Sequence, residues 1–362
     1  MRFDLSDDQV ALRDSARDLL DGRSSVERVR AVVDAGGGMD ADLWAAMVDQ
    51  GWTATELPEA SGGLGFGAVE VAVLCEEVGR HVAPAPFLPT VLALGALERA
   101  GDTARVEALL TGDVGCVAGI ADPTSVRATR AGKGWRLTGR PGPVPYAPSA
   151  AVAVVGATDD EGPALFAVDL DSFADRPARE PAMDQTRELG WLTLDASPAE
   201  RLGGTDAVEA VLRRGAAYAS AEMLGGAARA MEMAVDYAKE RVQFGRPIGS
   251  FQAVKHRCAD MLVDVEGMRS SAYWAAWCVG TDDPDAPVAA STAKIWCSDA
   301  SQRVMASALQ VHGGIGFTWE HDLHLYFKRA QLDRLSFGSA PYHRQRLAAL
   351  LRPRVAAGEG VI

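Results

Sequence analysis

Cysteine is scarce in this chain and follows no recognisable spacing. Its five residues are an odd number, are widely separated and include no C-x-x-C pair: Cys75, Cys116, Cys258, Cys278 and Cys297. Disulfide frameworks and structural zinc sites need paired or closely spaced cysteines, so the sequence predicts neither. We expect buried thiols in a protein of a reducing compartment.

Long apolar runs and an excess of basic residues are also missing. No run of about 18 apolar residues occurs, and Met1–Asp8 lacks the basic stretch and apolar core of a secretion signal. The formal net charge is −13, whereas nucleic acids and anionic membranes are held by cations. We therefore expect a soluble cytoplasmic protein with neither partner, in which an anionic ligand needs a local basic pocket.

The residues that are present predict an α+β fold. Hydrophobic residues make up 48% of the 362 and charged residues 23%, as in an ordinary soluble protein with a substantial core. From Ser6 to about Leu110 the apolar residues recur at three- and four-residue spacing, which indicates helices. Ser6, followed by two aspartates, is a good N-cap for the first of them. We predict an N-terminal helical domain over 1–115.

The spacing of the apolar residues changes between Cys116 and Leu202. Short apolar or alternating runs are bounded there by Gly, Pro and Asp: 135–138, 151–155, 164–168 and 189–194. Such runs are typical of antiparallel strands in a small barrel or sandwich, so we predict a middle β-domain over 116–204. Helical spacing then returns in long segments, for example Met261, Leu262, Val265 and Met268 on one face. This predicts a C-terminal four-helix bundle over 205–362.

Two motifs in this last region point to a phosphate-bearing cofactor. In Arg241–Gln252 a helical run ends at an arginine, whose planar guanidinium can bind a diphosphate through paired charge-assisted bonds. In Gln310–Phe317 two adjacent glycines allow a backbone to come close to a ligand. Either motif alone is more often an ordinary helix end with a glycine cap, but together they favour a cofactor site.

Both motifs resemble the flavin-contacting segments of the acyl-CoA dehydrogenase family, and the order of helices, strands and helices resembles that family across nearly the whole chain. The resemblance implies FAD as cofactor, which in that family is shared between subunits. It implies that this chain contacts the adenosine and diphosphate half of a neighbour's FAD. The residues that it assigns to this half are Arg241, Gln243, Phe244, Phe251, Gln252, Gln310, Val311, Gly313 and Gly314.

Three positions depart from the family pattern. A loop that should hold the flavin ring reads Ala118–Val126 and keeps only Asp122, Thr124 and Ser125 as polar residues. The catalytic glutamate, which removes a proton from the substrate in that family, is replaced by Phe337. The alternative position on an earlier helix is Gly215. The sequence therefore offers no catalytic residue at either position, and Glu222 is the nearest carboxylate to the second.

This combination resembles the base-lacking subunit of actinobacterial heteromeric acyl-CoA dehydrogenases that act on steroid side chains. The resemblance implies an α2β2 oxidoreductase that desaturates an acyl-CoA thioester at its α and β carbons, with the glutamate on a related partner subunit. Two alternatives stay open: a homo-oligomeric dehydrogenase with Glu222 as a relocated base, and a non-catalytic structural or regulatory relative.

Histidines do not change this interpretation. His312 lies in a turn among apolar residues and glycines, so we assign it no proton transfer. His321 and His324 are three residues apart, but no H-E-x-x-H pattern accompanies them. We predict no metal site.

Overall fold

The computed structural model describes residues 4–358. The chain divides into two compact units, each treated separately below. The helical unit comprises residues 1–26, 72–83 and 216–362, and the mixed unit comprises residues 27–71 and 84–215. The helices α4 and α7 cross from one unit into the other. The three domain boundaries expected from the sequence stay predictions.

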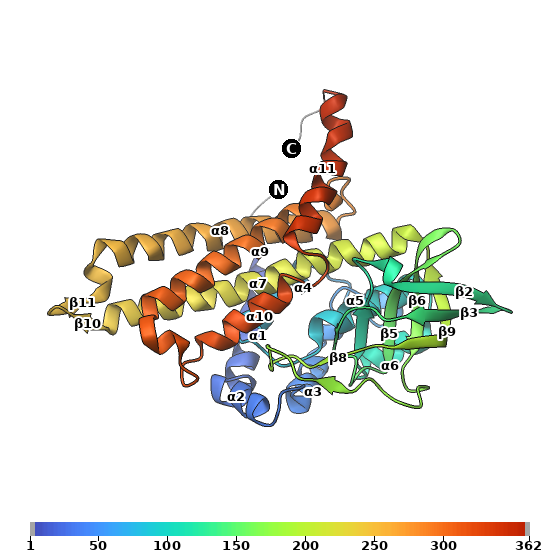
Figure 1. Cartoon of the computed structure of the whole chain (residues 1–362), viewed down its shortest axis with the longest axis horizontal. Coiled ribbons are helices and arrows are strands. Elements are labelled where there is room, and N and C mark those ends of the chain that lie inside the picture. The colour runs from blue at the N-terminus through green and yellow to red at the C-terminus, as the bar shows by residue number, and fades with distance from the viewer. Residues whose placement is uncertain (1–3, 359–362) are drawn as a thin grey trace. The chain divides into compact units, whose positions relative to one another are not determined.

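Long helices dominate the helical unit. Figure 1 shows α7, α8 and α9 running alongside one another, with the β10–β11 hairpin at one end. The elements of this unit are α1 (Asp7–Arg23), α4 (Ala68–Arg80), α7 (Thr205–Glu240), β10 (Val242–Gln243), β11 (Arg246–Pro247), the short 3-10 helix η4 (Ile248–Ser250), α8 (Gln252–Gly280), α9 (Ala286–His312), η5 (Gly313–Phe317), α10 (Leu323–Asp333) and α11 (Ala340–Ala356).

The local signals in the sequence explain where these helices begin and which faces they bury. Ser6 caps α1 in a reciprocal capping box, in which its Oγ accepts from the Gln9 N–H and the Gln9 side chain accepts from the Ser6 N–H. On α8 the predicted apolar face is correct at Met261, Val265 and Met268, which are buried. Leu262 is 49% exposed, so its assignment to that face was wrong.

Two glycines let α4 and α7 touch through their backbones. A Cβ on Gly79 would lie 1.9 Å from the carbonyl oxygen of Glu222, and a Cβ on Gly225 would lie 1.8 Å from that of Glu76. Contacts this short do not occur for real side chains, so neither position accepts one without moving a helix. The crossing fixes the distance between α4 and α7. It therefore also fixes the position of Glu222 on α7 relative to α4.

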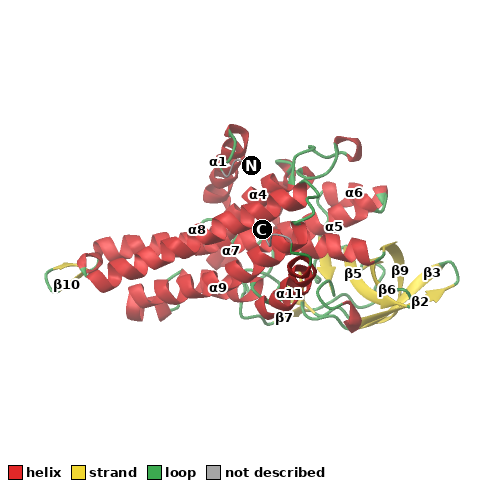
Figure 2. Cartoon of the chain, turned by 90° about the horizontal axis from the view of Figure 1, so that it is seen from above, coloured by secondary structure: helices red, strands yellow, loops and turns green. Residues whose placement is uncertain are grey.

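The mixed unit combines short helices with most of the strands. Figure 2 shows its strands packed together. Its elements are α2 (Val26–Asp34), α3 (Ala41–Asp49), η1 (Trp52–Ala54), η2 (Glu59–Ser61), α5 (Phe87–Arg99), α6 (Thr103–Leu110), β1 (Gly115–Ala118), η3 (Pro123–Ser125), β2 (Val126–Ala131), β3 (Gly134–Gly139), β4 (Val144–Pro145), β5 (Val152–Asp159), β6 (Gly162–Asp169), β7 (Arg179–Glu180), β8 (Leu189–Gly190) and β9 (Leu194–Gly203).

The principal sheet follows the order β1-β5-β2-β3-β9-β6, and β6 also pairs with β5. This second pairing closes the ring of strands, so the barrel alternative of the sequence prediction describes it. Most pairings are antiparallel, as expected, but β1 runs parallel to β5 over four residue pairs, and β2 meets β5 in parallel at Arg127 and Thr158. β5 is buried along almost its whole length, which explains its continuous apolar sequence.

One predicted strand was wrong. The alternating run 189–194 was expected to form a single strand, but β8 ends at Gly190 and β9 begins at Leu194. β8 pairs with β4 and β7 in a separate three-stranded sheet, whereas β9 pairs with β3 and β6. The chain therefore changes partners within the run, and alternation cannot reveal such a change because it reports only which side chains are buried.

Two further sequence features can be checked in the described part of the chain. All five cysteines are free thiols, and all except the half-buried Cys258 are buried. Over residues 4–358, none of the helices combines the length and apolar character that a membrane crossing requires.

The α4–α7 crossing generates a stability prediction. We expect Gly225→Ala to lower the free energy of unfolding by about 3 kcal/mol or more, because its Cβ forces the backbones apart. The neighbouring Gly226 is the matched control, since a Cβ there meets its nearest atom at 3.5 Å. Gly226→Ala should be neutral or stabilising by up to about 1 kcal/mol. Urea unfolding of both variants measures the difference, and equal effects would contradict the role assigned to the crossing.

Candidate functional site

The chain turns sharply after α7 and forms an exposed hairpin. Arg241 follows the last residue of α7, and its N–H donates to the Tyr237 carbonyl at 2.9 Å. Gln243 pairs with Arg246 across the two short strands. Between them Phe244 and Gly245 both have positive φ, 53° and 77°, the combination that closes a two-residue hairpin of the primed type. The predicted break of the helix at this point is confirmed.

Phe244 is unusual in both conformation and exposure. A positive φ is disfavoured for a side chain with a Cβ, and the ring is 91% exposed to solvent. Its one ring contact is an edge-on approach to Phe251 at 6.0 Å between centroids. A strained, outward-facing aromatic residue contributes little to the stability of its own chain, so this geometry suits contact with another molecule.

The base of the hairpin is ordered by Phe251. The guanidinium of Arg246 lies 4.2 Å above the Phe251 ring, a cation–π contact that packs the second strand against the start of α8. Gln252 begins α8 with an exposed side chain. Arg241 and Gln243 are exposed as well, so the polar groups predicted to bind the cofactor are all accessible.

The second motif lies at the end of α9. Gln310 is exposed, whereas Val311 and His312 are buried. Gly313 adopts φ 64° and ψ −138°, which requires glycine. A Cβ added to Gly313 or to Gly314 would meet no atom of the described chain within 4 Å. Packing within the chain therefore does not explain the second glycine, but close approach of a ligand would explain it. The buried Val311 can offer only its backbone.

The helix that precedes the first motif contacts the second motif within the helical unit. The His312 ring stacks on Tyr237, with centroids 4.8 Å apart, and so joins the end of α9 to the last turn of α7. Its Nδ1 pairs with the Ala308 carbonyl at 2.8 Å, which identifies Nδ1 as the protonated nitrogen. Burial lowers the pKa of His312. A neutral, stacked imidazole fits a structural role at the junction of the two helices.

Phe337, which the sequence analysis expects at the position of the catalytic glutamate, lies in a firmly held loop between α10 and α11. Phe337 is half-buried and has φ 55°, and its carbonyl accepts a hydrogen bond from Nε2 of His343 at 2.8 Å. The buried Lys294 of α9 donates to the carbonyls of Arg334 at 2.9 Å and Gly338 at 3.0 Å. The loop is thus fixed on both sides of a phenyl ring that cannot accept a proton.

Lys294 and His343 had no role in the sequence prediction. Desolvation lowers the pKa of Lys294 to about 7, and a neutral amine still has two N–H groups for the two loop carbonyls. Desolvation likewise lowers the pKa of His343 to about 4. In its neutral form His343 donates through Nε2, and its Nδ1 accepts from the Ser291 hydroxyl at 3.3 Å.

Glu222 is a buried partner of an arginine. Its Oε1 accepts from Nη1 of Arg329 at 2.7 Å, and both side chains are almost completely buried. Arg329 also donates to the carbonyls of Val82 and Ala83. A carboxylate committed to a buried cation is poorly placed to accept a substrate proton. Gly215, the other alternative position, is buried and has no side chain.

The loop predicted to have lost flavin-ring contacts lies in the mixed unit and uses its polar groups locally. Asp122 caps η3 by accepting from the Thr124 N–H and hydroxyl, and the Ser125 hydroxyl donates to the Asp122 carbonyl at 2.8 Å. These are the bonds of a short turn.

His321 and His324 lie near the second motif. His324 stacks on Trp319 at 4.5 Å, and His321 meets His312 edge-on at 4.4 Å. Over the described residues, no group of three or more His, Cys, Asp or Glu is arranged to hold a metal ion.

Two family models match most of the chain. Residues 6–112 match the acyl-CoA dehydrogenase N-terminal domain, and residues 202–351 match the acyl-CoA dehydrogenase C-terminal domain. The chain belongs to the acyl-CoA dehydrogenase family. Among its relatives is the acyl-CoA dehydrogenase IpdE2 of Mycolicibacterium smegmatis, 34% identical over 95% of this chain and 99% of that protein.

Two solved structures share the fold over nearly their full length. A variant of the Tcur3481-Tcur3483 steroid ACAD, where ACAD stands for acyl-CoA dehydrogenase, is 34% identical, with a TM-score of 0.90 over 96% of this chain and 99% of that chain. The ChsE4-ChsE5 complex from Mycobacterium tuberculosis is 32% identical, with a TM-score of 0.91 over 97% and 99%. The predicted family and fold are confirmed.

The Glu222–Arg329 pair gives a test of the relocated-base alternative. We expect Glu222→Gln to lower the free energy of unfolding by about 3 to 5 kcal/mol, because it removes the carboxylate that pairs with the buried Arg329 charge. Turnover per folded molecule of the natural assembly should be unchanged. The double variant Glu222→Leu with Arg329→Met removes both charges and should recover much of the stability. A well-folded Glu222→Gln protein with no turnover would contradict this assignment.

The His343 imidazole generates a pH prediction. Its pKa is about 4 in the folded protein and about 6.5 when unfolded. Above pH 6.5 both states are neutral, whereas between 6.5 and 4 only the unfolded state takes up the proton. Stability should therefore fall by on the order of 3 kcal/mol as the pH drops through this range. Urea unfolding at several pH values measures this fall. The His343→Gln variant should lack the part of this fall in stability that comes from the imidazole. An identical pH profile in the variant would refute the assignment.

Proposed function

We propose that this chain is one subunit of an FAD-dependent acyl-CoA dehydrogenase whose catalytic glutamate belongs to a related partner subunit. The observation that carries the proposal is an asymmetry. The motifs around Arg241 and Gly314 are both present, and the Tyr237–His312 stack joins the helices that carry them, whereas the loop expected to hold the family base carries Phe337.

The exposed residues fit the adenosine and diphosphate half of FAD. Arg241 supplies a fixed positive charge and a planar set of donors for the diphosphate. Gln243 and Gln310 offer amide donors and acceptors for ribose or adenine, and the open space around Gly313 and Gly314 admits a ligand against the backbone. Phe244 projects far enough to contact a neighbouring subunit.

Bound FAD supplies the hydride acceptor of the reaction. The residues of this chain bind and orient it, and they leave the removal of the α-proton to a carboxylate of the partner. Asp122 supports this division of roles between the two subunits. Its carboxylate already accepts a hydrogen bond within its own loop, where it caps η3. The pair then desaturates an acyl-CoA thioester at its α and β carbons.

The relatives support the finer parts of the proposal. One similar structure is named as a steroid ACAD and another as a complex of two differently named chains. By similarity we propose a heteromeric α2β2 assembly, with a steroid side-chain thioester as substrate and the cytoplasm as the compartment.

The central experiment is to purify this chain alone and with its candidate partner. Stoichiometric flavin and turnover should appear only in the complex, because neither chain alone has the complete site. Flavin absorbance and acyl-CoA oxidation with an artificial electron acceptor measure the two properties. Full flavin and turnover in this chain alone would refute the proposal.

Within that complex Arg241→Ala should remove most of the bound flavin. Loss of a charge-assisted hydrogen bond of about 1.5 to 3 kcal/mol corresponds to roughly 10- to 100-fold weaker binding. Arg352 of α11 is a matched control, because it is also exposed and lies outside both motifs. Arg352→Ala should retain flavin, and equal retention by the two variants would argue against a role for Arg241.

A further inference from the structure

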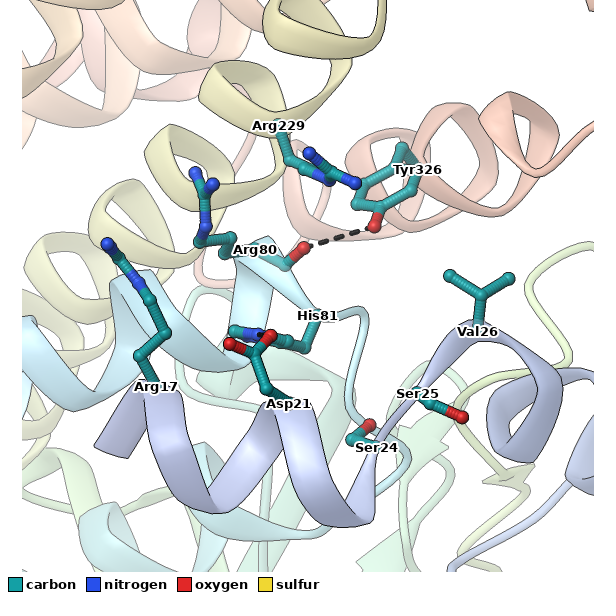
Figure 3. A pocket seen from close by; sticks show the side chains of 9 residues that line it. All are labelled: Arg17, Asp21, Ser24, Ser25, Val26, Arg80, His81, Arg229 and Tyr326. Carbon is teal, nitrogen blue, oxygen red and sulfur yellow. Dashed lines mark hydrogen bonds and ion pairs between the residues drawn. The ribbon is translucent and has the colours of Figure 1, made fainter. Parts of the chain in front are cut away.

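The helical unit holds a second feature that the flavin half-site does not use. A pocket of about 240 Å³ lies among α1, α4, α7 and α10, and all the residues that line it belong to this one unit. Figure 3 shows these side chains, including Arg17, Arg80, Arg229 and Tyr326. No proposed flavin contact lines this pocket.

Guanidiniums from three helices are gathered at this pocket. Arg17 makes a two-bond pair with Glu77, and Arg80 makes another with Glu232. Arg229 lies at 3.5 Å from the same Glu232, a distance too long for a strong bond. Glu77 and Glu232 hold the arginines but do not line the pocket, so its wall is more cationic than the cluster as a whole.

His81 also lines this pocket. Its Nδ1 faces the Glu77 carbonyl at 2.8 Å, and its Nε2 faces the carboxylate of Asp21 at 3.0 Å. Among the described lining residues Asp21 is the one carboxylate, against three arginines.

The charges on the pocket wall do not cancel. Arg17, Arg80 and Arg229 bring three positive charges to the wall, and Asp21 brings one negative charge. The counter-charges Glu77 and Glu232 are not among the described lining residues. An anion in the pocket would therefore meet more positive than negative groups, in a chain whose formal net charge is −13.

The composition of the pocket wall also favours a polar ligand. Ser24 is 97% buried, since its exposed fraction is 3%, and no described residue gives its Oγ a hydrogen-bond partner. Figure 3 shows this hydroxyl turned toward the space below Tyr326. A buried hydroxyl without a partner costs about 1 to 3 kcal/mol, so the pocket is suited to water or a polar ligand rather than to an apolar group.

We propose that this pocket binds a small oxyanion, a carboxylate or a phosphate group, at its arginine-lined side. Guanidinium groups suit both, because their paired N–H donors match two oxygens of one ligand group. The volume admits such an ion together with a short substituent or several waters. A bound anion would join α1 to α4 and α7 and so stabilise the packing of α1. The site is independent of the function proposed above.

The test measures ligand-dependent stability of the full chain in its natural assembly. Inorganic phosphate and succinate are titrated in parallel at constant ionic strength, with chloride as the exchanged anion. We expect a saturable rise in Tm of about 2 to 4 °C with at least one of the two, and the comparison shows which group the pocket prefers. Isothermal titration calorimetry gives the affinity. No saturable effect of either anion would overturn the proposal.

Variants locate the effect. Arg229→Gln should weaken anion binding about tenfold or more and leave the Arg80–Glu232 pair intact. Arg229→Lys keeps the charge but loses the paired donors, so it should bind with intermediate affinity. The control is Arg303→Gln, which removes an arginine of an exposed ion pair with Asp264 outside the pocket. Equal binding by the Arg229→Gln and Arg303→Gln proteins would also overturn the proposal.

Discussion

The backbone contact between α4 and α7 is the constraint on which the helical unit depends. Because Gly79 and Gly225 have no side chains, the carbonyls of Glu222 and Glu76 lie directly against the opposite helix. At this closest approach Glu222 turns into the core and neutralises Arg329 of α10. Arg329 in turn reaches the carbonyls of Val82 and Ala83 just beyond α4. Three helices are thus fixed around a single crossing.

That constraint extends along α7 to the region with functional character. The same helix that meets α4 at Gly225 ends at Glu240, where Arg241 and the hairpin begin. Tyr237, one turn earlier, stacks on His312 and holds the end of α9 in place. Rigid helices therefore position two segments in which the polar residues Arg241, Gln243 and Gln310 are exposed. The helices hold the segments in place, and the polar side chains on the segments stay accessible. A subunit needs this arrangement if a neighbour holds part of its ligand.

Much of this arrangement could be predicted from the sequence. The capping box at Ser6, the helix break at Phe244 and Gly245, and the barrel strands 135–138, 151–155 and 164–168 are local signals, and the structure confirms them. The run 189–194 was misread, because alternation does not show that the chain moves from one sheet to another.

Other features needed the structure because they depend on residues far apart in the chain. Lys294 lies 40 and 44 positions from the carbonyls that it binds. The Arg329 side chain reaches Glu222, 107 positions away. A lysine or glutamate inside a helical run is usually solvated, so residue type alone did not predict that these side chains are buried. A weak signal was available for Lys294, which follows a run of small residues at 289–293 that is typical of tightly packed helices.

The exposed aromatic residues of the two motifs affect how stable the chain is in the cell. Phe244 is 91% exposed and Phe317 is 77% exposed, and accessible rings of this kind favour aggregation and capture by the quality-control machinery. A copy of the chain whose rings stay uncovered is open to aggregation and to quality-control capture from the moment of synthesis. The abundance of this polypeptide should therefore follow the abundance of the molecule that covers these rings. Production of the two in matched amounts then matters as much as the intrinsic folding of the chain.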